Sequence, residues 1–171
     1  EAPDASLGAD PAAARDAILS ESLLAAYDEV AGQLGPDPKA WAWGKLHQAR
    51  FDHALSPKVP AAEREAWSSG TAPMAGTALS PLAATWRPND YRVVAGASFR
   101  MVLDVGAWDN SKAINTPGQS GDPASPHFRD LFPIWAKGEY VPLSYSRAAV
   151  EAATERVISL KPSGGANTPS R

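Results

Sequence analysis

Cysteine is absent from this chain of 171 residues, and its absence excludes several kinds of chemistry. Disulfide bonds, thiolate metal sites and a cysteine nucleophile all require a thiol. Long hydrophobic runs are absent as well, since no uninterrupted apolar segment approaches the roughly 20 residues of a membrane-spanning helix. The sequence therefore predicts a globular domain that uses no thiol chemistry and contains no transmembrane helix.

An excess of positive charge is also missing. The chain carries 16 Lys and Arg against 19 Asp and Glu, which gives a net charge of −3. Binding to nucleic acid or to an anionic membrane surface usually depends on a basic patch, so neither partner is predicted. Hydrophobic residues make up 44% of the chain and charged residues 20%, an ordinary balance for one folded domain.

The clearest predicted element is a helix over residues 11–34. Asp10 can act as its N-cap, Pro11 suits the first turn, and Gly35 followed by Pro36 ends the pattern. The apolar positions with helical spacing are Ile18, Leu23, Leu24, Tyr27, Val30, Ala31 and Leu34. The opposite face is acidic, so we expect it to face water.

Shorter elements are predicted after this helix. Residues 56–90 hold five prolines and read as a long irregular segment, whereas 90–106 alternate like two strands or one strand bent at a bulge. Three further elements are expected: a short helix after Pro126 with Pro133 in its first turn or at a kink, a helix capped by Ser146, and a strand over 156–162. The fold class is therefore α+β, over residues 1–162, followed by a mobile tail at 163–171.

Aromatic residues are concentrated just after the first helix. Trp41, Trp43, Leu46 and Phe51 fall within a short span, which is too much apolar area to leave in water. The six tryptophans of the chain are spread widely, so they are better explained as core or interface anchors than as a ligand box.

The three histidines do not form a metal-ligand pattern. His47 and His53 lie six residues apart, which does not place them on one helix face, so local hydrogen bonds beside the tryptophans are the favoured interpretation. His127 follows Pro126 at the start of a predicted helix, where an imidazole often tethers a loop. A role for His127 as general base would require a nucleophile within reach, which spacing does not show.

Three carboxylates and a serine between residues 104 and 122 are candidates for metal binding or catalysis. Asp104, Asp109 and Asp122 offer oxygen ligands for Ca²⁺ or an acid–base pair, but they lack the dense alternation of an EF-hand loop. Ser120 lies between glycines without the G-x-S-x-G spacing of a nucleophile elbow, so it is disfavoured as a nucleophile. The residues alone define no catalytic, cofactor or metal site.

Several segments together resemble the C-terminal part of the penicillin acylase family of N-terminal-nucleophile hydrolases. They are WAWGKLHQARFDHAL, YRVVAGASFRMVLDVG, NTPGQSGDPASPHFRDLFPIWAKGEYVPLSYS and VISLKP. The most specific part is the stretch Gly118–His127, which we call the signature loop. Two departures stand out: Ala54 replaces the proline usual after F-x-H, and residues 68–88 lack an expected glycine-glycine-aspartate run.

The resemblance implies that this chain is the C-terminal segment of a large subunit and contributes late strands and helices to an αββα sandwich. In such enzymes a self-cleaved precursor exposes an N-terminal serine that acts as nucleophile, with its own α-amino group as base. That serine is expected upstream of this chain, so no catalytic residue is assigned here. The family-signature residues are interpreted as structural: Asn115, Gly118, Gln119, Ser120, Gly121 and His127. Of these, His127 and Asn115 are expected to tether the loop.

The resemblance also sets expectations about partners and location. The partners are the rest of the precursor, meaning the small subunit and the N-terminal part of the large subunit, and an acyl amide substrate in the complete enzyme. The expected substrate is a linear amide of a β-lactam, an acyl-homoserine lactone or a related compound. No cofactor is expected in this segment, although a structural calcium site in the complete enzyme stays open. The family habit implies a periplasmic or secreted protein.

Two hypotheses of function follow. In the first, the chain is a scaffold segment of an acyl-amide hydrolase and is inactive when isolated. In the second, it stands alone as a non-catalytic binding or structural module. An upstream coding sequence with a serine at a self-cleavage junction would favour the first hypothesis, and a reading frame that begins near Glu1 would favour the second.

Overall fold

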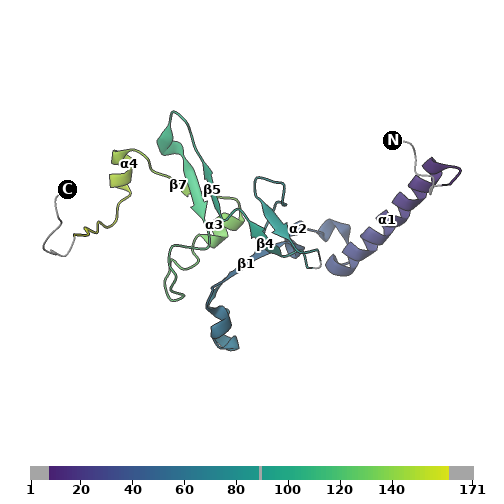
Figure 1. The fold of residues 1–171 in the computed structure, drawn as a ribbon, viewed down its shortest axis with the longest axis horizontal. Coiled ribbons are helices and arrows are strands. Elements are labelled where there is room, and N and C mark those ends of the chain that lie inside the picture. The colour runs from purple at the N-terminus through teal and green to yellow at the C-terminus, as the bar shows by residue number, and fades with distance from the viewer. Residues whose placement is uncertain (1–7, 89, 162–171) are drawn as a thin grey trace, which may run out of the picture. The chain divides into compact units, whose positions relative to one another are not determined.

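A computed structural model describes residues 8–88 and 90–161 of the chain (Figure 1). The chain divides into two compact units, which we describe separately: unit 1 comprises Glu1–Ala97 and unit 2 comprises Ser98–Arg171. Both contain helices and small antiparallel sheets, which is compatible with the predicted α+β class. The tail predicted at residues 163–171 lies outside the described residues.

Unit 1 begins with helix α1 (Pro11–Leu34), whose bounds confirm the prediction. The side chain of Asp10 accepts a hydrogen bond from the Ala13 N–H at 3.0 Å, which caps the first turn. Gly35 ends the helix with φ of 92°, a conformation that glycine adopts without strain. No residue of α1 is buried.

Two small antiparallel sheets follow in unit 1. Strand β1 (Gln48–Asp52) pairs with β2 (Ser68–Pro73), and β3 (Ala84–Trp86) pairs with β4 (Val93–Gly96). The short helical elements of this unit are η2 (Pro38–Ala40), α2 (Trp43–Leu46), η3 (Ser56–Lys58) and η4 (Ala61–Glu63).

The prediction that residues 56–90 form a long irregular segment is wrong at two places, because β2 and β3 lie within it. Strand β2 has the sequence SSGTAP, which lacks the alternation of apolar and polar residues that marks a half-buried strand. Its register is set by β1, with Ala49 opposite Ala72 and Arg50 opposite Thr71. These residues are extended because they pair with a distant strand, and the local sequence pattern does not indicate that pairing.

Unit 2 contains a three-stranded antiparallel sheet in the order β5-β6-β7. The strands are β5 (Phe99–Val102), β6 (Lys112–Asn115) and β7 (Val141–Pro142), and the helical elements are η5 (Trp108–Asn110), α3 (Phe132–Ala136) and α4 (Arg147–Ala152). Of the two alternatives predicted for residues 90–106, two strands or one bent strand, the structure shows two strands, β4 and β5, which belong to different sheets. Pro133 lies in the first turn of α3, and the Ser146 hydroxyl caps α4 by accepting from the Ala149 N–H at 3.2 Å.

The strand predicted over residues 156–162 is not found in its described part, 156–161. The apolar side chains there stay largely in water, with Val157 80% and Leu160 91% exposed. A strand needs a neighbouring strand to satisfy its backbone groups, and none pairs with these residues in the described chain.

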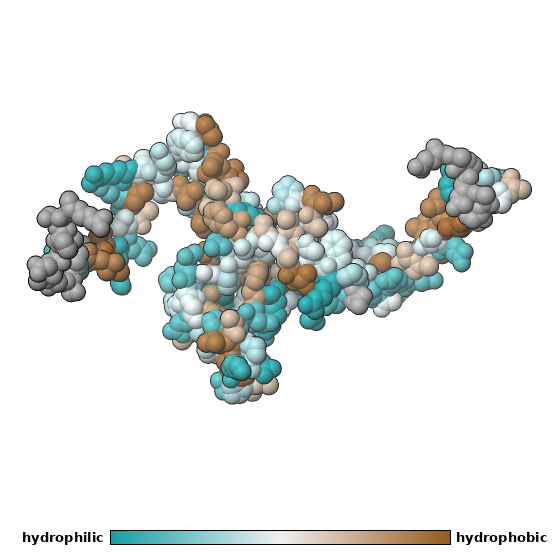
Figure 2. Space-filling model, viewed as in Figure 1, coloured by the Kyte–Doolittle hydropathy of each residue, from teal (hydrophilic) through white to brown (hydrophobic). Residues whose placement is uncertain are grey.

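Buried hydrophobic side chains are few in both units. Unit 1 buries Ala49, Met74 and Ala84, and unit 2 buries Ala113, Ile114, Phe128, Phe132, Trp135 and Ala136. Trp135 is 1% exposed and is the one tryptophan of the described chain that is fully buried, while Trp43 and Trp108 are more than a third exposed. Hydrophobic residues are correspondingly visible at the surface in Figure 2. No helix among the described residues is long and apolar enough to cross a membrane.

Candidate functional site

The signature loop is held by backbone hydrogen bonds in unit 2. The carbonyl oxygen of His127 accepts from the N–H groups of Gln119 at 2.9 Å and Ser120 at 3.0 Å. At Gly118, an added Cβ would lie 2.3 Å from this same carbonyl oxygen, so the two ends of the loop approach each other too closely for any side chain there. Composition alone indicated a loop, but this close crossing is a tertiary feature.

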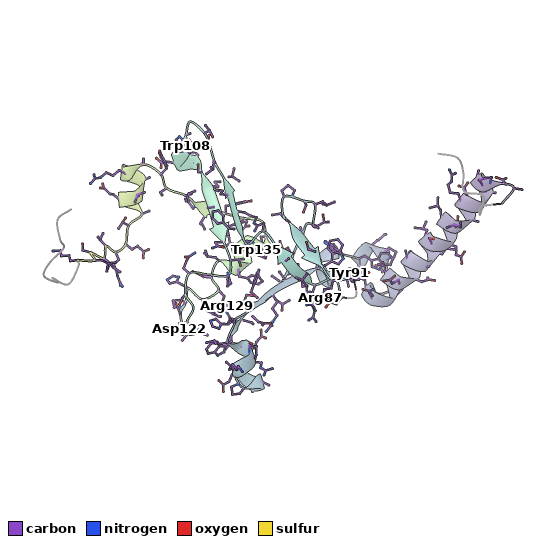
Figure 3. All side chains as sticks on the ribbon, viewed as in Figure 1. Arg87, Tyr91, Trp108, Asp122, Arg129 and Trp135 are labelled. Carbon is purple, nitrogen blue, oxygen red and sulfur yellow. The ribbon has the colours of Figure 1, made fainter. Side chains whose placement is uncertain are left out.

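The polar side chains of the loop are engaged with near neighbours. The Ser120 hydroxyl accepts from the Asp122 N–H at 3.1 Å, and the Nδ1 atom of His127 lies 2.8 Å from an Asp130 carboxylate oxygen. Asp122 and Arg129 lie on this same connection between β6 and α3 (Figure 3). The His127 side chain is 69% exposed, and its ring pairs with Asp130 rather than with Ser120. The loop therefore presents no serine activated by a base.

Asn115 and His127 contribute to the loop in different ways. The side-chain oxygen of Asn115 accepts from the Thr116 N–H at 3.0 Å, a contact within its own turn at the end of β6. His127 spans the loop through its backbone carbonyl oxygen, which accepts two hydrogen bonds from N–H groups. Any residue at this position would supply the same carbonyl. Gly121 has no atom within 4 Å of an added Cβ, unlike Gly118.

The two histidines of unit 1 both lie beside tryptophans, as expected, but only His53 makes a local hydrogen bond, since the partner of His47 is 44 residues away. His47 is fully buried, stacks on Trp43 with ring centroids 4.6 Å apart, and its Nδ1 atom lies 2.9 Å from the Tyr91 carbonyl oxygen. Because a carbonyl oxygen only accepts, the Nδ1 atom carries the proton. His53 accepts from the Leu55 N–H at 3.1 Å and contacts the edge of Trp67. Both rings are structural parts of aromatic clusters.

The three carboxylates considered as ligands bind separate neighbours. Asp104 accepts from the Asn110 side chain at 3.1 Å, and Asp122 from the Ala124 N–H at 2.9 Å. Asp109 accepts from the N–H groups of Tyr145 and Ser146, each at 2.8 Å. Within residues 8–88 and 90–161, no group of three potential ligands from His, Asp or Glu is placed to hold a metal ion.

Hydrogen bonding lowers the pKa of Asp109. The Ser146 hydroxyl contributes most, followed by the backbone N–H groups of Ser146 and Tyr145. A carboxyl with a lowered pKa in the folded state stabilises the fold above its ordinary pKa of about 4, and this stabilisation is lost as pH falls through the lowered value. Asp109 thereby links the β5–β6 connection to the start of α4.

This link gives a pH-dependent prediction. We expect Asp109→Asn to lower the melting temperature at pH 7 and to have a smaller effect at an acidic pH below the lowered pKa of Asp109, because the wild-type carboxyl is then neutral, as asparagine is. Thermal unfolding of both proteins across this range measures the difference. Asp28→Asn, at an exposed carboxylate of α1, controls for the change in charge. An Asp109→Asn effect of equal size at both pH values would contradict the assignment.

Arg100 is the residue that the sequence analysis missed. Arg100 lies in β5, and its Nη2–H group donates a hydrogen bond to the Trp135 carbonyl oxygen at the end of α3. Its guanidinium carbon lies 5.1 Å from the centre of the Trp135 ring and 5.8 Å from that of the Tyr140 ring. Burial lowers its pKa, and its Nε and Nη1 atoms have no hydrogen-bond partner among the described residues. The only sequence signal was an arginine within an otherwise apolar strand.

A polar cavity of about 460 Å³ lies in unit 1 and is lined by Arg50, Asp52, Arg87, Asp90 and Arg92, among others. Arg50 forms ion pairs with Asp52 and Glu65, each at 2.9 Å, and the hydrogen bond that its Nη1–H donates to the Glu65 carboxylate is the main cause of its raised pKa. Asp90 accepts from the Arg92 N–H at 3.1 Å.

The chain combines helices with small antiparallel sheets, and in its signature loop Ser120 and His127 bond to Asp122 and Asp130. The family model for penicillin amidase matches residues 2–152, so the chain belongs to the penicillin amidase family. Members of this family are amide hydrolases.

Curated relatives agree with this membership. The chain is 36% identical over 133 residues to an acyl-homoserine lactone acylase QuiP of Pseudomonas putida, covering 75% of this chain and 16% of the relative. It is 36% identical over 150 residues to the penicillin acylase 2 proenzyme of Pseudomonas sp. strain SE83, covering 84% and 18%. The QuiP protein of Pseudomonas aeruginosa is 34% identical over 139 residues, covering 74% and 16%. The chain thus spans less than a fifth of the length of these relatives.

Proposed function

We propose that this chain is a C-terminal scaffold segment of the large subunit of an acyl-amide hydrolase, and that it is inactive in isolation. The observation that carries the proposal is the combination of a family match across residues 2–152 with large apolar side chains that the described chain leaves exposed. A domain that folds alone normally buries such side chains, whereas a segment of a larger fold presents them to the rest of that fold.

The sheets support the same proposal. Strand β5 exposes Phe99, Met101 and Val102, each by more than half, although it is paired with β6. In an αββα sandwich, helices and a second sheet would cover such faces. The proposed fold of the complete enzyme is the N-terminal-nucleophile hydrolase sandwich, to which the strands of this chain contribute.

The proposed reaction is hydrolysis of a linear amide, in which water cleaves the bond between an acyl group and an amine. The names of the relatives support two substrate classes, acyl-homoserine lactones and penicillins. The proposed nucleophile is a serine exposed by self-cleavage upstream of this segment, and the proposed partner is the remainder of the precursor. A periplasmic or secreted location is part of the same proposal and rests on the family resemblance.

The isolated chain is expected to show no hydrolysis of a phenylacetyl or fatty-acyl chromogenic amide above the rate in buffer. The reason is that Ser120 and His127, the nucleophile and base that the loop would offer, bond to Asp122 and Asp130 instead of to each other. Release of the chromophore measures the rate. Turnover that is lost in Ser120→Ala or His127→Ala would show that the loop is catalytic and would contradict the proposal. Turnover that survives both substitutions would indicate a nucleophile elsewhere in the chain and would also contradict it.

The coding sequence provides the complementary test. A reading frame that continues upstream to a serine at a self-cleavage junction supports the scaffold proposal. A frame that begins near Glu1 would overturn it and leave the stand-alone binding or structural module as the explanation.

A further inference from the structure

His47 is a titratable side chain in the interior of unit 1 that the proposed function does not use. The residue is fully buried, and its ring stacks on Trp43 and meets the edge of the Trp86 ring with centroids 5.6 Å apart. Its Nδ1–H group donates to the Tyr91 carbonyl oxygen at 2.9 Å, whereas its Nε2 atom has no hydrogen-bond partner among the described residues. The site therefore suits a neutral imidazole that makes a single hydrogen bond.

A second proton on this ring would be poorly accommodated. It would bind at Nε2, where the new N–H group would find no acceptor among residues 8–88 and 90–161, and the ring would carry a positive charge away from water. Burial of an unpaired charge is strongly unfavourable. Attraction between an imidazolium and the stacked Trp43 ring offsets only part of this cost, because a cation–π contact is much weaker than the hydration of a full charge.

The charged side chains on the neighbouring elements do not supply the missing partner. Glu29 of α1 accepts from the Tyr91 hydroxyl at 3.2 Å, and the Lys45 ammonium group of α2 donates to the Ala40 carbonyl oxygen at 2.7 Å. Both side chains belong to exposed residues, so water weakens their fields at the His47 ring. The other charged residues of β1 and of the connection between β3 and β4 are exposed as well: Arg50, Asp52, Arg87, Asp90 and Arg92.

The hydrogen bond from His47 holds a backbone conformation that is rare for its residue type. Tyr91 has φ of 55°, in the left-handed region, and its N–H donates to the Arg87 carbonyl oxygen at 3.0 Å. A strained conformation of this kind persists only while its surroundings hold it. Arg87 and Tyr91 lie on the connection between β3 and β4 (Figure 3), from which Arg87, Asp90 and Arg92 line the polar cavity of unit 1. The neutral His47 ring thus helps to position one wall of this cavity.

We propose that His47 is an acid-sensitive switch, which holds the connection between β3 and β4 closed while its ring is neutral and releases it on protonation. The inference goes beyond the proposed function and does not depend on it, because it uses only contacts within unit 1. A released imidazole reaches water, where the ordinary pKa is about 6.5, so at acidic pH the open form binds one more proton than the closed form. The closed form is therefore favoured above about pH 6.5 and loses stability as the pH falls.

Hydrogen exchange in the complete protein, expressed from its gene, tests the switch. After correction for the intrinsic rate, we expect the opening equilibrium at the Tyr91 amide to rise about 30-fold from about pH 7.5 to about pH 5, as uptake of one proton by the open form requires. The amides of β6 in unit 2 serve as the internal reference and are expected to change little. An opening equilibrium at Tyr91 that follows that of β6 across this range would overturn the proposal.

Two variants assign the pH dependence to one ring. His47→Asn removes the titratable group but keeps an N–H donor close to the position of Nδ1, so we expect opening at Tyr91 to become nearly independent of pH. His53→Asn is the matched control in the same unit and is expected to keep the wild-type dependence. Retention of the pH dependence in His47→Asn, or its loss in His53→Asn, would contradict the assignment to His47.

Exchange of the imidazole C2 proton gives a readout that needs no variant to fold. This exchange passes through the protonated ring, so a ring that is protonated only in the open form exchanges slowly. We expect the C2 proton of His47 to exchange about tenfold or more slowly than that of His127, whose side chain is 69% exposed. Equal rates for the two rings, measured by mass spectrometry of the wild-type protein, would show that His47 takes up a proton without opening and would overturn the proposal.

Discussion

Trp135→Ala is expected to destabilise unit 2 by about 3–5 kcal/mol, the usual cost of deleting a fully buried large aromatic side chain. Trp135 is 1% exposed, and its ring stacks on Phe132 with centroids 6.2 Å apart. The same ring lies against the guanidinium of Arg100, which is buried and whose Nε and Nη1 atoms have no hydrogen-bond partner among the described residues. The substitution therefore removes packing and also removes part of what stabilises a buried charge.

Hydrogen exchange at β6, residues 112–115, measures this loss as a lower free energy of opening. Trp108→Ala is the matched control, because Trp108 is 39% exposed and its loss should cost clearly less. Adding Arg100→Met to Trp135→Ala is expected to recover part of the stability. Loss of the Trp135 ring leaves the Arg100 charge beside an apolar cavity, and Arg100→Met removes that charge. An additive double mutant would show that the ring and the guanidinium are not coupled.

Gly118→Ala is expected to open the signature loop, at a cost of about 3 kcal/mol. The new Cβ would lie 2.3 Å from the His127 carbonyl oxygen and 2.7 Å from the carbonyl carbon of Phe128, and both are backbone atoms that no rotamer change can move. The chain must therefore separate at this crossing, which is an overpacking effect at the upper end of its usual range.

The amides of Gln119 and Ser120 report directly on this separation. Both donate to the His127 carbonyl, so both should lose protection from hydrogen exchange in Gly118→Ala. Gly121→Ala in the same loop is the control, because nothing lies within 4 Å of its added Cβ. Protection that is unchanged in Gly118→Ala, or lost equally in both variants, would show that the close crossing does not hold the loop.

Local signals in the sequence were sufficient for the ends of α1 and the start of α4, but they did not predict α2. Asp10, Pro11 and Gly35 marked the ends of α1 and Ser146 marked the start of α4, whereas Pro133 left a first turn and a kink open in the helix that the structure shows as α3. Each of these residues acts on backbone groups within four positions of itself, either by capping them or by restricting φ. A neighbouring part of the chain is not needed for such effects, so the pattern of residues predicts them.

The candidate site was predictable in composition and family but not in geometry. Glycine, proline and serine indicated a loop at residues 118–127, and the resemblance indicated its family. Two contacts depend on the way β5, β6 and α3 pack together. Gly118 lies against the carbonyl of His127, and Arg100 is buried against Trp135. These contacts join residues up to 35 positions apart, beyond the reach of a local pattern.

The sequence by itself determined the helix ends, the absence of thiol chemistry and membership of an amide hydrolase family, because those properties reside in single residues and short motifs. Only the tertiary structure decided that β2 and β3 are strands, that residues 156–161 are not, and that the apolar face of α1 is left uncovered. Strand pairing and burial depend on which distant segment lies alongside. An element that lacks such a neighbour still has the residue pattern of a buried element, but its apolar side chains stay exposed.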